Sequence, residues 1–363
     1  MPCLAAFAVG LLGMPPYIRW LKHLQIEQYL REEGPKSHAS KARTPTMGGV
    51  CFIAAIVLSL FGWWIASSTT SIDGVLVLGT AALCALVGFV DDFAKVTNKS
   101  NKGVSARVRL IVEGLLGLLL AIGLLLTAQE MGRIIICLVP ADGGGTEQLL
   151  VPRALLPSWA FCLLSIFLVA ATTNAVNLHD GMDGLAAGTS AQVFATLAAL
   201  LYETHQFTYS AIAAATAGGI ISFLVFNKHP ARIFMGDTGS LFIGGLMASL
   251  VIAGGLLLWF VPLSVLYIAE TISVMSQVVY FKLTKEYTPE KPMSTLALTW
   301  LKLTKRLPGE GRRLFRMAPL HHHFEAVFAE KNVGEGVVVL GFWILQFFLC
   351  ASVLLVFYCL KAS

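Results

Sequence analysis

The sequence has little charge: 13% of its 363 residues are Asp, Glu, Lys or Arg, whereas 56% are hydrophobic. An ordinary soluble domain carries about 25% charged residues, so this composition excludes a soluble globular protein. The apolar runs are also unbroken, whereas the strands of a membrane β-barrel alternate apolar and polar residues in segments of about 10. These two absences leave a helical membrane protein.

Several other signals are missing. The seven cysteines form no CxxC pair and most lie in apolar runs, so neither a disulfide framework nor a cysteine metal site is indicated. The first apolar run begins almost at Met1 and lacks a basic segment and a small-residue cleavage site, so we expect a retained span rather than a signal peptide. No internal repeat or low-complexity tract interrupts the chain. A single transmembrane domain over residues 1–363 is predicted.

About ten apolar blocks are long enough to cross roughly 30 Å of hydrocarbon as helices. They fall at residues 3–20, 48–68, 74–91, 109–128, 157–176, 186–202, 209–226, 239–255, 258–283 and 336–360. The predicted fold is therefore all-α, with about ten transmembrane helices. In the loop at 129–156, apolar runs at 134–139 and 149–151 flank a stretch of glycines, which favours a small β-hairpin.

The basic residues set the expected orientation. Most of the 26 Lys and Arg residues lie in alternate loops, and cytoplasmic loops carry the excess of basic residues. Both termini are therefore predicted to face outward. The cytoplasmic loops expected to form the active site are residues 21–47, 92–108, 177–185, 227–238 and 282–335. Around Trp300, leucines and lysines favour an amphipathic helix at the headgroup level, with a solvated basic loop as the alternative.

Two adjacent acids, Asp91 and Asp92, end one predicted span, and Lys95 follows one turn later. Acids at the edge of the hydrocarbon are costly, which makes them functional candidates. A helix end that reaches into water is the alternative. Glu113 and Glu270 lie inside other spans, and we expect helix-packing roles for both.

A run of amides, acids and glycines joins two spans with almost no spacer. The run contains the amides Asn174 and Asn177, the acids Asp180 and Asp183, and Gly181. The amides are suited to phosphate or sugar hydroxyls and the acids to a metal or a base, while glycine permits close approach of a ligand. Helix capping is the alternative, because Asp-Gly commonly makes turns.

A further loop begins at Asn227, passes Phe234 and ends at Asp237, where another span starts. Free backbone N–H groups at a helix start favour anions, but an Asp there repels phosphate unless a cation lies between them. Mg²⁺ usually takes one or two carboxylates together with substrate phosphates. The sequence therefore predicts a magnesium site at Asp237, with an ordinary N-cap as the alternative.

The last cytoplasmic loop contains three consecutive histidines, His321, His322 and His323, preceded by several arginines. Three adjacent histidines do not easily face one zinc ion, and no Cys or HExxH pattern accompanies them. We interpret the triplet as a phosphate-binding motif, with a polar loop of no special function as the alternative.

Near the N-terminus, Lys41 and Thr46 precede a Gly-Gly turn at the start of a span. Basic and hydroxyl groups thus stand together before the turn. The signal is weak by itself, because a basic residue beside a membrane is also what the charge bias predicts.

Taken together, five segments resemble those of the polyprenyl-phosphate N-acetylhexosamine-1-phosphate transferases. They are TPTMGG at 44–49, VDDFAK at 90–95, NAVNLHDGMDGLA at 174–186, FMGDTGS at 234–240 and MAPLHHHFE at 317–325. The triple histidine favours the muramoyl-pentapeptide branch of this family. Two departures are visible: His179 stands where a small hydroxyl residue is expected, and Arg107 or Arg109 where family members use lysine.

The resemblance implies an enzyme of the bacterial plasma membrane with its active site on the cytoplasmic side. Undecaprenyl phosphate would attack the β-phosphate of UDP-MurNAc-pentapeptide, giving lipid I and UMP, with Mg²⁺ as cofactor. The only other implied partners are membrane lipid and a second copy of the chain, and no nucleic acid is expected.

Residue roles follow from the same resemblance. Asp237 would be the main magnesium ligand, Asp91 the candidate base with Asp92 beside it, and the three histidines would meet the diphosphate. Asn174, Asn177 and Asp180 would line the phosphate and sugar site. Independently of the resemblance, Lys95 is suited to neutralise charge in phosphoryl transfer. The expected nucleotide site consists of Lys41, Thr46, Gly181, Asp183, Asn227 and Phe234.

Two other functions fit parts of the sequence. A secondary transporter would also have about ten spans and buried acids, but its polar residues usually lie near the bilayer midplane, often in two repeated halves. Here they lie at the inner ends of spans. A sibling transferase that uses UDP-GlcNAc is the closer alternative.

Overall fold

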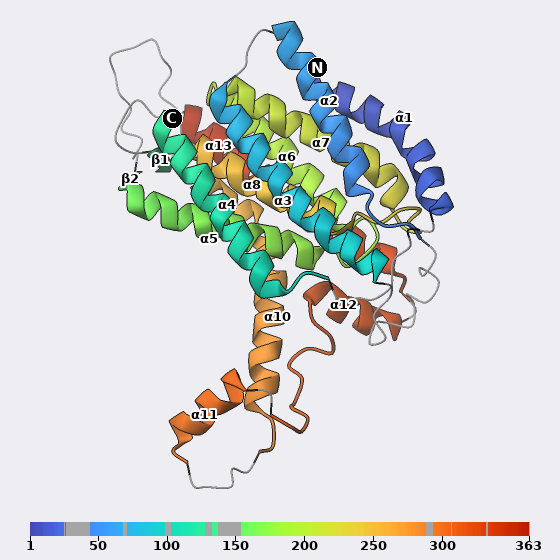
Figure 1. Cartoon of the computed structure of the whole chain (residues 1–363), viewed down its shortest axis with the longest axis vertical. Coiled ribbons are helices and arrows are strands. Elements are labelled where there is room, and N and C mark those ends of the chain that lie inside the picture. The colour runs from blue at the N-terminus through green and yellow to red at the C-terminus, as the bar shows by residue number, and fades with distance from the viewer. Residues whose placement is uncertain are drawn as a thin grey trace.

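The computed structural model describes residues 1–24, 26, 44–67, 71–98, 103–127, 133–136, 154–287, 293–305, 307–331 and 333–362. Most of these residues belong to helices packed side by side in a bundle (Figure 1). Within the described ranges, nine helices are long and apolar enough to cross a membrane, or ten spans are present if a bent pair of helices counts as one. The predicted polytopic all-α fold is confirmed.

The nine straight spans follow the apolar blocks of the sequence, with ends shifted by a few residues. They are α1 (Pro2–His23), α2 (Gly49–Ser67), α3 (Ile72–Thr97), α4 (Ala106–Thr127), α5 (Ser158–His179), α6 (Leu185–Glu203), α7 (Phe207–Asn227), α8 (Gly236–Gly254) and α13 (Glu335–Ala362). A helix satisfies all its backbone hydrogen bonds internally, which hydrocarbon requires of any spanning segment.

The span predicted at 258–283 consists of two helices. α9 (Leu257–Leu263) and α10 (Val265–Leu283) meet at an angle of 66°. Pro262 lies in the last turn of α9, and a proline inside a helix removes a backbone donor and clashes with the preceding turn. The bend sends α10 out of the bundle, with α11 (Thr295–Thr304) at its far end (Figure 1).

Helix α8 forms the centre of the bundle, since 89% of the residues in its apolar stretch are buried. α3 packs closely along it. A Cβ atom on Gly88 of α3 would lie 2.2 Å from the carbonyl oxygen of Asp237, so only glycine allows this approach. The tight contact brings the end of α3, where the paired acids lie, against the first turn of α8.

The two ends of the bundle differ. Strands β1 (Arg133–Ile136) and β2 (Ala154–Leu156) pair antiparallel within the loop where a hairpin was expected, although the predicted second run at 149–151 lies outside the described residues. Both termini lie toward this end, whereas α12 (Leu320–Ala329) lies at the opposite end (Figure 1). With the bent pair counted as one span, the number of spans is even, which agrees with termini at one end of the bundle. Their outward orientation remains a prediction.

Candidate active site

The carboxylate of Asp237, in the first turn of α8, receives polar groups from three other helices. Lys95 of α3 places its Nζ 2.7 Å from Oδ2, and Asn177 of α5 donates from Nδ2 to Oδ1 at 2.7 Å. Arg109 of α4 approaches Oδ2 at 3.5 Å. Residues far apart in the sequence therefore converge on one carboxylate at the end of the bundle where the site was predicted.

Asp91 shares a cation with Asp237. Its Oδ2 lies 2.5 Å from Lys95 Nζ, one helical turn further along α3. Its Oδ1 accepts a hydrogen bond from the backbone N–H of Val104 at 2.6 Å. Two carboxylates from different helices thus meet at a single ammonium group.

Asp92 has different partners although it is the next residue in the chain. Its Oδ1 accepts from the backbone N–H of Asp237 at 3.0 Å. Its Oδ2 accepts from the backbone N–H and the hydroxyl of Thr238, at 2.9 and 2.7 Å. The side chain caps the N-terminus of α8 from outside, which satisfies donors that have no partner within the helix. Asp92 therefore positions the turn that carries Asp237.

Asn174 extends the site along α5. Its Oδ1 accepts from Arg109 Nη2 at 2.9 Å, and its Nδ2 donates to Glu113 Oε2 at 2.5 Å. Glu113, for which a helix-packing role was expected, is buried beside Arg109 and its carboxylate also belongs to this polar network. Arg109 and Glu113 were not among the predicted site residues. Their spacing of one helical turn at the inner end of a span was the sequence feature that could have identified them.

Asp180 lies at the C-terminal cap of α5, just outside the membrane-spanning segment. Burial raises the pKa of its carboxyl to about 8, and the charges of nearby carboxylates add to the effect. These carboxylates belong to Asp237, Asp92 and Asp183. The predicted acids thus influence one another electrostatically, as expected of a common site.

The predicted nucleotide residues Asp183 and Asn227 connect two loops. Asp183 is buried, and its Oδ2 accepts from the backbone N–H of Ala231 at 3.0 Å and lies 3.1 Å from His229 Nδ1. Asn227 Oδ1 accepts from the backbone N–H of Gly184 at 3.0 Å. Both side chains are held by the backbone of the opposite loop, so the loops after α5 and α7 form one unit.

Thr46 and Phe234 also lie on neighbouring segments. The backbone N–H of Phe234 donates to the carbonyl of Pro45 at 2.8 Å, and the Phe234 carbonyl accepts from Gly48 N–H at 2.8 Å. Thr46, between these two contacts, is buried. Lys41 lies outside the described residues.

The three histidines point to different partners at the start of α12. His322 Nδ1 lies 2.9 Å from Glu325 Oε2, and His323 Nδ1 accepts from the backbone N–H of Arg316 at 3.2 Å. His321 is fully buried, and its backbone N–H donates to Glu270 at 3.2 Å. The triplet therefore does not present one surface to one ligand.

Of the triplet, His321 is the member that reaches the predicted phosphate loop. A Cβ atom on Gly181 would lie 2.1 Å from His321 Nε2, so this ring lies against the turn after α5 and requires glycine there. Glu270, for which a helix-packing role was expected, also caps the N-terminus of α12 with its carboxylate. Glu270 thereby places His321.

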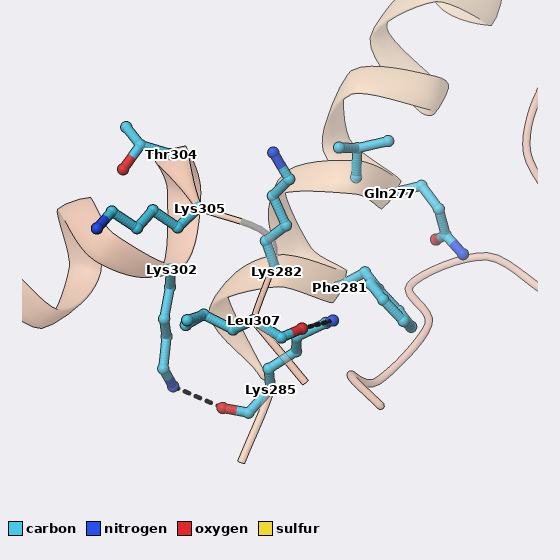
Figure 2. A pocket seen from close by; sticks show the side chains of 9 residues that line it. Gln277, Phe281, Lys282, Lys285, Lys302, Thr304, Lys305 and Leu307 are labelled. Carbon is cyan, nitrogen blue, oxygen red and sulfur yellow. Dashed lines mark hydrogen bonds between the residues drawn. The ribbon is translucent and has the colours of Figure 1, made fainter. Parts of the chain in front are cut away.

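A cavity of about 500 Å³ lies elsewhere, between the end of α10 and α11 (Figure 2). Its lining includes four lysines but none of the predicted site residues. Lys302 Nζ donates to the carbonyl of Lys285, and Lys285 Nζ to that of Leu307, both at 2.7 Å. These lysines hold α11 to the end of α10. The expected amphipathic helix does form, with Leu296 and Trp300 exposed.

The residues around Asp237 fit a magnesium ion. The Asp91 and Asp237 carboxylates converge on one cationic position, now taken by Lys95 Nζ. One or two carboxylates together with substrate phosphate oxygens form the donor set that Mg²⁺ takes in enzymes. Asp237, with Asp91 beside it, would supply the oxygen ligands.

Comparison with known proteins identifies the class. Residues 74–255, which include the ends of α3, α5 and α8 where the acids meet, match glycosyl transferase family 4. The chain belongs to this family.

More particularly, the chain is 35% identical over 341 residues to phospho-N-acetylmuramoyl-pentapeptide-transferase of Geobacillus sp. (strain WCH70), covering 93% of this chain and 91% of the relative. It is 39% identical over 340 residues to the protein of the same name from Heliobacterium modesticaldum, covering 94% and 92%.

Proposed function

We propose that this protein transfers phospho-MurNAc-pentapeptide from UDP-MurNAc-pentapeptide to undecaprenyl phosphate, giving lipid I and UMP. Relatives named for a phospho-N-acetylmuramoyl-pentapeptide transferase align with more than nine tenths of the chain. The observation that carries the proposal is the convergence of Lys95, Arg109 and Asn177 on the carboxylate of Asp237. Phosphoryl transfer needs mainly charge neutralisation and alignment of the reacting groups. Lys95 and Arg109 can supply the charge, and Asn177 can help to align the substrate.

The chain's own groups have separable tasks in this reaction. Lys95 and Arg109 supply positive charge beside the reacting phosphates, while the amides of Asn174 and Asn177 orient sugar or phosphate oxygens. Magnesium bound at Asp237 would neutralise the diphosphate of the donor. Asp92 keeps the first turn of α8 in place.

Direct attack by the acceptor is the mechanism that we favour. A phosphate monoester has a second pKa of about 6, so it is already mostly a dianion at pH 7 and needs little help from a base. Asp237 is engaged by cations and amide groups from three helices, which suits a metal ligand better than a nucleophile. A covalent aspartyl intermediate is therefore unnecessary.

The location follows from the same chemistry. The nucleotide donor is too polar to enter hydrocarbon, whereas the polyprenyl chain of the acceptor stays within it. We expect the acids Asp91, Asp92 and Asp237 to lie at the cytoplasmic face of the bacterial plasma membrane, because the basic loops are predicted to lie on that side. A homodimer, implied by the family resemblance, stays a prediction.

Release of UMP by the purified protein in detergent tests the function. UDP-MurNAc-pentapeptide and UDP-GlcNAc should be compared, each with undecaprenyl phosphate and Mg²⁺. We expect release only with the first donor, and only when the acceptor is present. Activity with UDP-GlcNAc alone would favour the sibling transferase, and no release with either donor would contradict the transferase proposal.

A further inference from the structure

Three buried side chains meet beside the Asp237 cluster, where α5, α10 and α12 come together. They are His179, Glu270 and His321, and none of the three exposes any surface. One nitrogen or oxygen atom of each lies within 4.8 Å of those of the other two. A helix-packing contact does not require two imidazoles around a buried carboxylate.

The distances suit a tetrahedral metal ion. Glu270 Oε1 lies 3.2 Å from His321 Nδ1 and 3.7 Å from His179 Nδ1. Zinc holds nitrogen and oxygen ligands at about 2.0–2.2 Å, which puts tetrahedral ligand atoms about 3.4 Å apart. The two separations lie on either side of that value, and the ligand atoms of the two imidazoles lie within 4.8 Å of each other.

The imidazoles also lack other partners. Apart from their contacts with Glu270, the ring nitrogens of His179 and His321 have no hydrogen bond within the described part of the chain. A buried polar atom without a partner costs free energy, and a metal bond would satisfy one nitrogen of each ring. Two histidines and one glutamate also form a recognised zinc donor set. We propose that His179, Glu270 and His321 bind a zinc ion.

Two aromatic rings lie beside His179. The ring of Tyr267 lies 4.8 Å from that of His179, and the ring of Phe342 lies 5.8 Å away. In such an apolar environment, the Glu270 carboxylate needs a compensating positive charge. His179 stands where the family resemblance predicts a small hydroxyl residue, so the site would be a feature of this chain rather than of every relative.

Zinc here would also affect His321. A metal bound to Nδ1 places the ring proton on Nε2, and Nε2 lies against Gly181 in the predicted phosphate loop. The ion would tie α12 to α5 and fix the tautomer of this histidine. This consequence rests on the proposed transferase function, whereas zinc binding itself does not.

Metal content tests the proposal without reference to activity. The full-length protein should be purified in detergent through a tag that uses no metal resin, and zinc measured by mass spectrometry. We expect about one zinc per chain in the unmodified protein and almost none in His179→Ser or Glu270→Gln. Cobalt should replace zinc and give the strong visible absorption of tetrahedral Co²⁺, which His179→Ser should lack.

Two variants serve as controls. His229→Ala disrupts a similar but half-exposed group, Asp183, His229 and Glu335, and Asp237→Asn removes the proposed magnesium ligand. Both should keep zinc. A zinc-selective chelator should lower the melting temperature of the unmodified protein but not that of His179→Ser, which monitors folding. Absence of zinc from the unmodified protein, or an unchanged zinc content in His179→Ser, would overturn the site.

Discussion

Side chains from α3, α4 and α5 converge on the carboxylate of Asp237. A group held by a lysine, an arginine and an amide is fixed in position before a substrate arrives. Electrostatic preorganisation of this kind commonly contributes about 10²–10³-fold to a rate. The acid at this position is therefore expected to matter through its charge and not through its size.

Replacing Asp237 by Asn should keep the fold and reduce UMP release by at least about 100-fold. The amide is similar in shape but has no charge with which to hold a metal, so millimolar Mg²⁺ should not restore turnover. The matched control is Glu203→Gln, the same chemical change in an acid that pairs with Lys361 near the C-terminus. Near-normal turnover of Asp237→Asn at millimolar Mg²⁺ would show that Asp237 is not the magnesium ligand.

Asp180 should make stability depend on pH. Its folded pKa is about 8, against about 3.9 for an unfolded Asp. Between these values the folded state binds more protons, so the free energy of unfolding falls as pH rises. The melting temperature in detergent without Mg²⁺ should decrease from about pH 5 to pH 8, and Asp180→Asn should weaken this decrease. Identical pH profiles for the two proteins would show that Asp180 does not titrate in this range.

At the scale of elements, the start of α8 depends on a side chain from another helix. Asp92 of α3 accepts hydrogen bonds from the backbone N–H groups of Asp237 and Thr238. An external cap of this kind joins two helices and fixes the direction of the first turn. The stability of α8 and the position of the proposed metal ligand are therefore coupled.

Loss of this cap should reduce both stability and activity. Asp92→Ala should cost about 0.5–2 kcal/mol, the usual value of a helix cap, and should lower kcat because the first turn of α8 shifts. Asp92→Asn keeps one acceptor oxygen and should be affected less. Thermal unfolding and UMP release measure the two effects.

Ser71→Ala provides the control for the cap experiment. Ser71 caps α3 at the other end of that helix, where its Oγ accepts from Gly74 N–H at 3.0 Å. This variant should lose similar stability but keep its kcat. If Asp92→Asn were as inactive as Asp92→Ala while remaining fully stable, the charge of Asp92 would act directly in the reaction.

At the scale of the whole molecule, the helix ends divide the protein into two faces. The end of α3 and helix α12 lie at one end, and the β1–β2 pair and both termini lie toward the other (Figure 1). Asp91 and Asp92 belong to the first end, because they lie in the last turns of α3. The excess of basic residues at the first end predicts that it faces the cytoplasm. A thiol-labelling experiment can test this orientation.

The two ends of α7 offer a matched pair of labelling positions, since His205 precedes this helix, His229 follows it, and both are exposed. After replacement of the native cysteines, His229→Cys should react with a membrane-impermeant thiol reagent only from the cytoplasmic side. His205→Cys should react only from the outside. The reverse pattern would invert the topology, and labelling of both from one side would show that α7 does not span.

Much of the site was visible in the sequence because acids, amides and histidines are rare in a chain with 13% charged residues. Asp91, Lys95, Asn177 and Asp237 were all predicted, and the structure brings them into direct contact. Arg109 was noted only as a departure from the family, because a basic residue at the inner end of a span is expected for orientation alone.

The sequence by itself determined the membrane class, the approximate spans and the loops that carry polar groups, because hydrophobic length is a local property of the chain. Only the tertiary structure decided which polar groups meet. Asp91 and Asp92 are neighbours, yet successive helical positions point about 100° apart, so the packing of α8 against α3 gives them different partners. Glu270 looked like a packing residue for the same reason: the partner that reveals its role, His321, comes from a helix about fifty residues further along the chain.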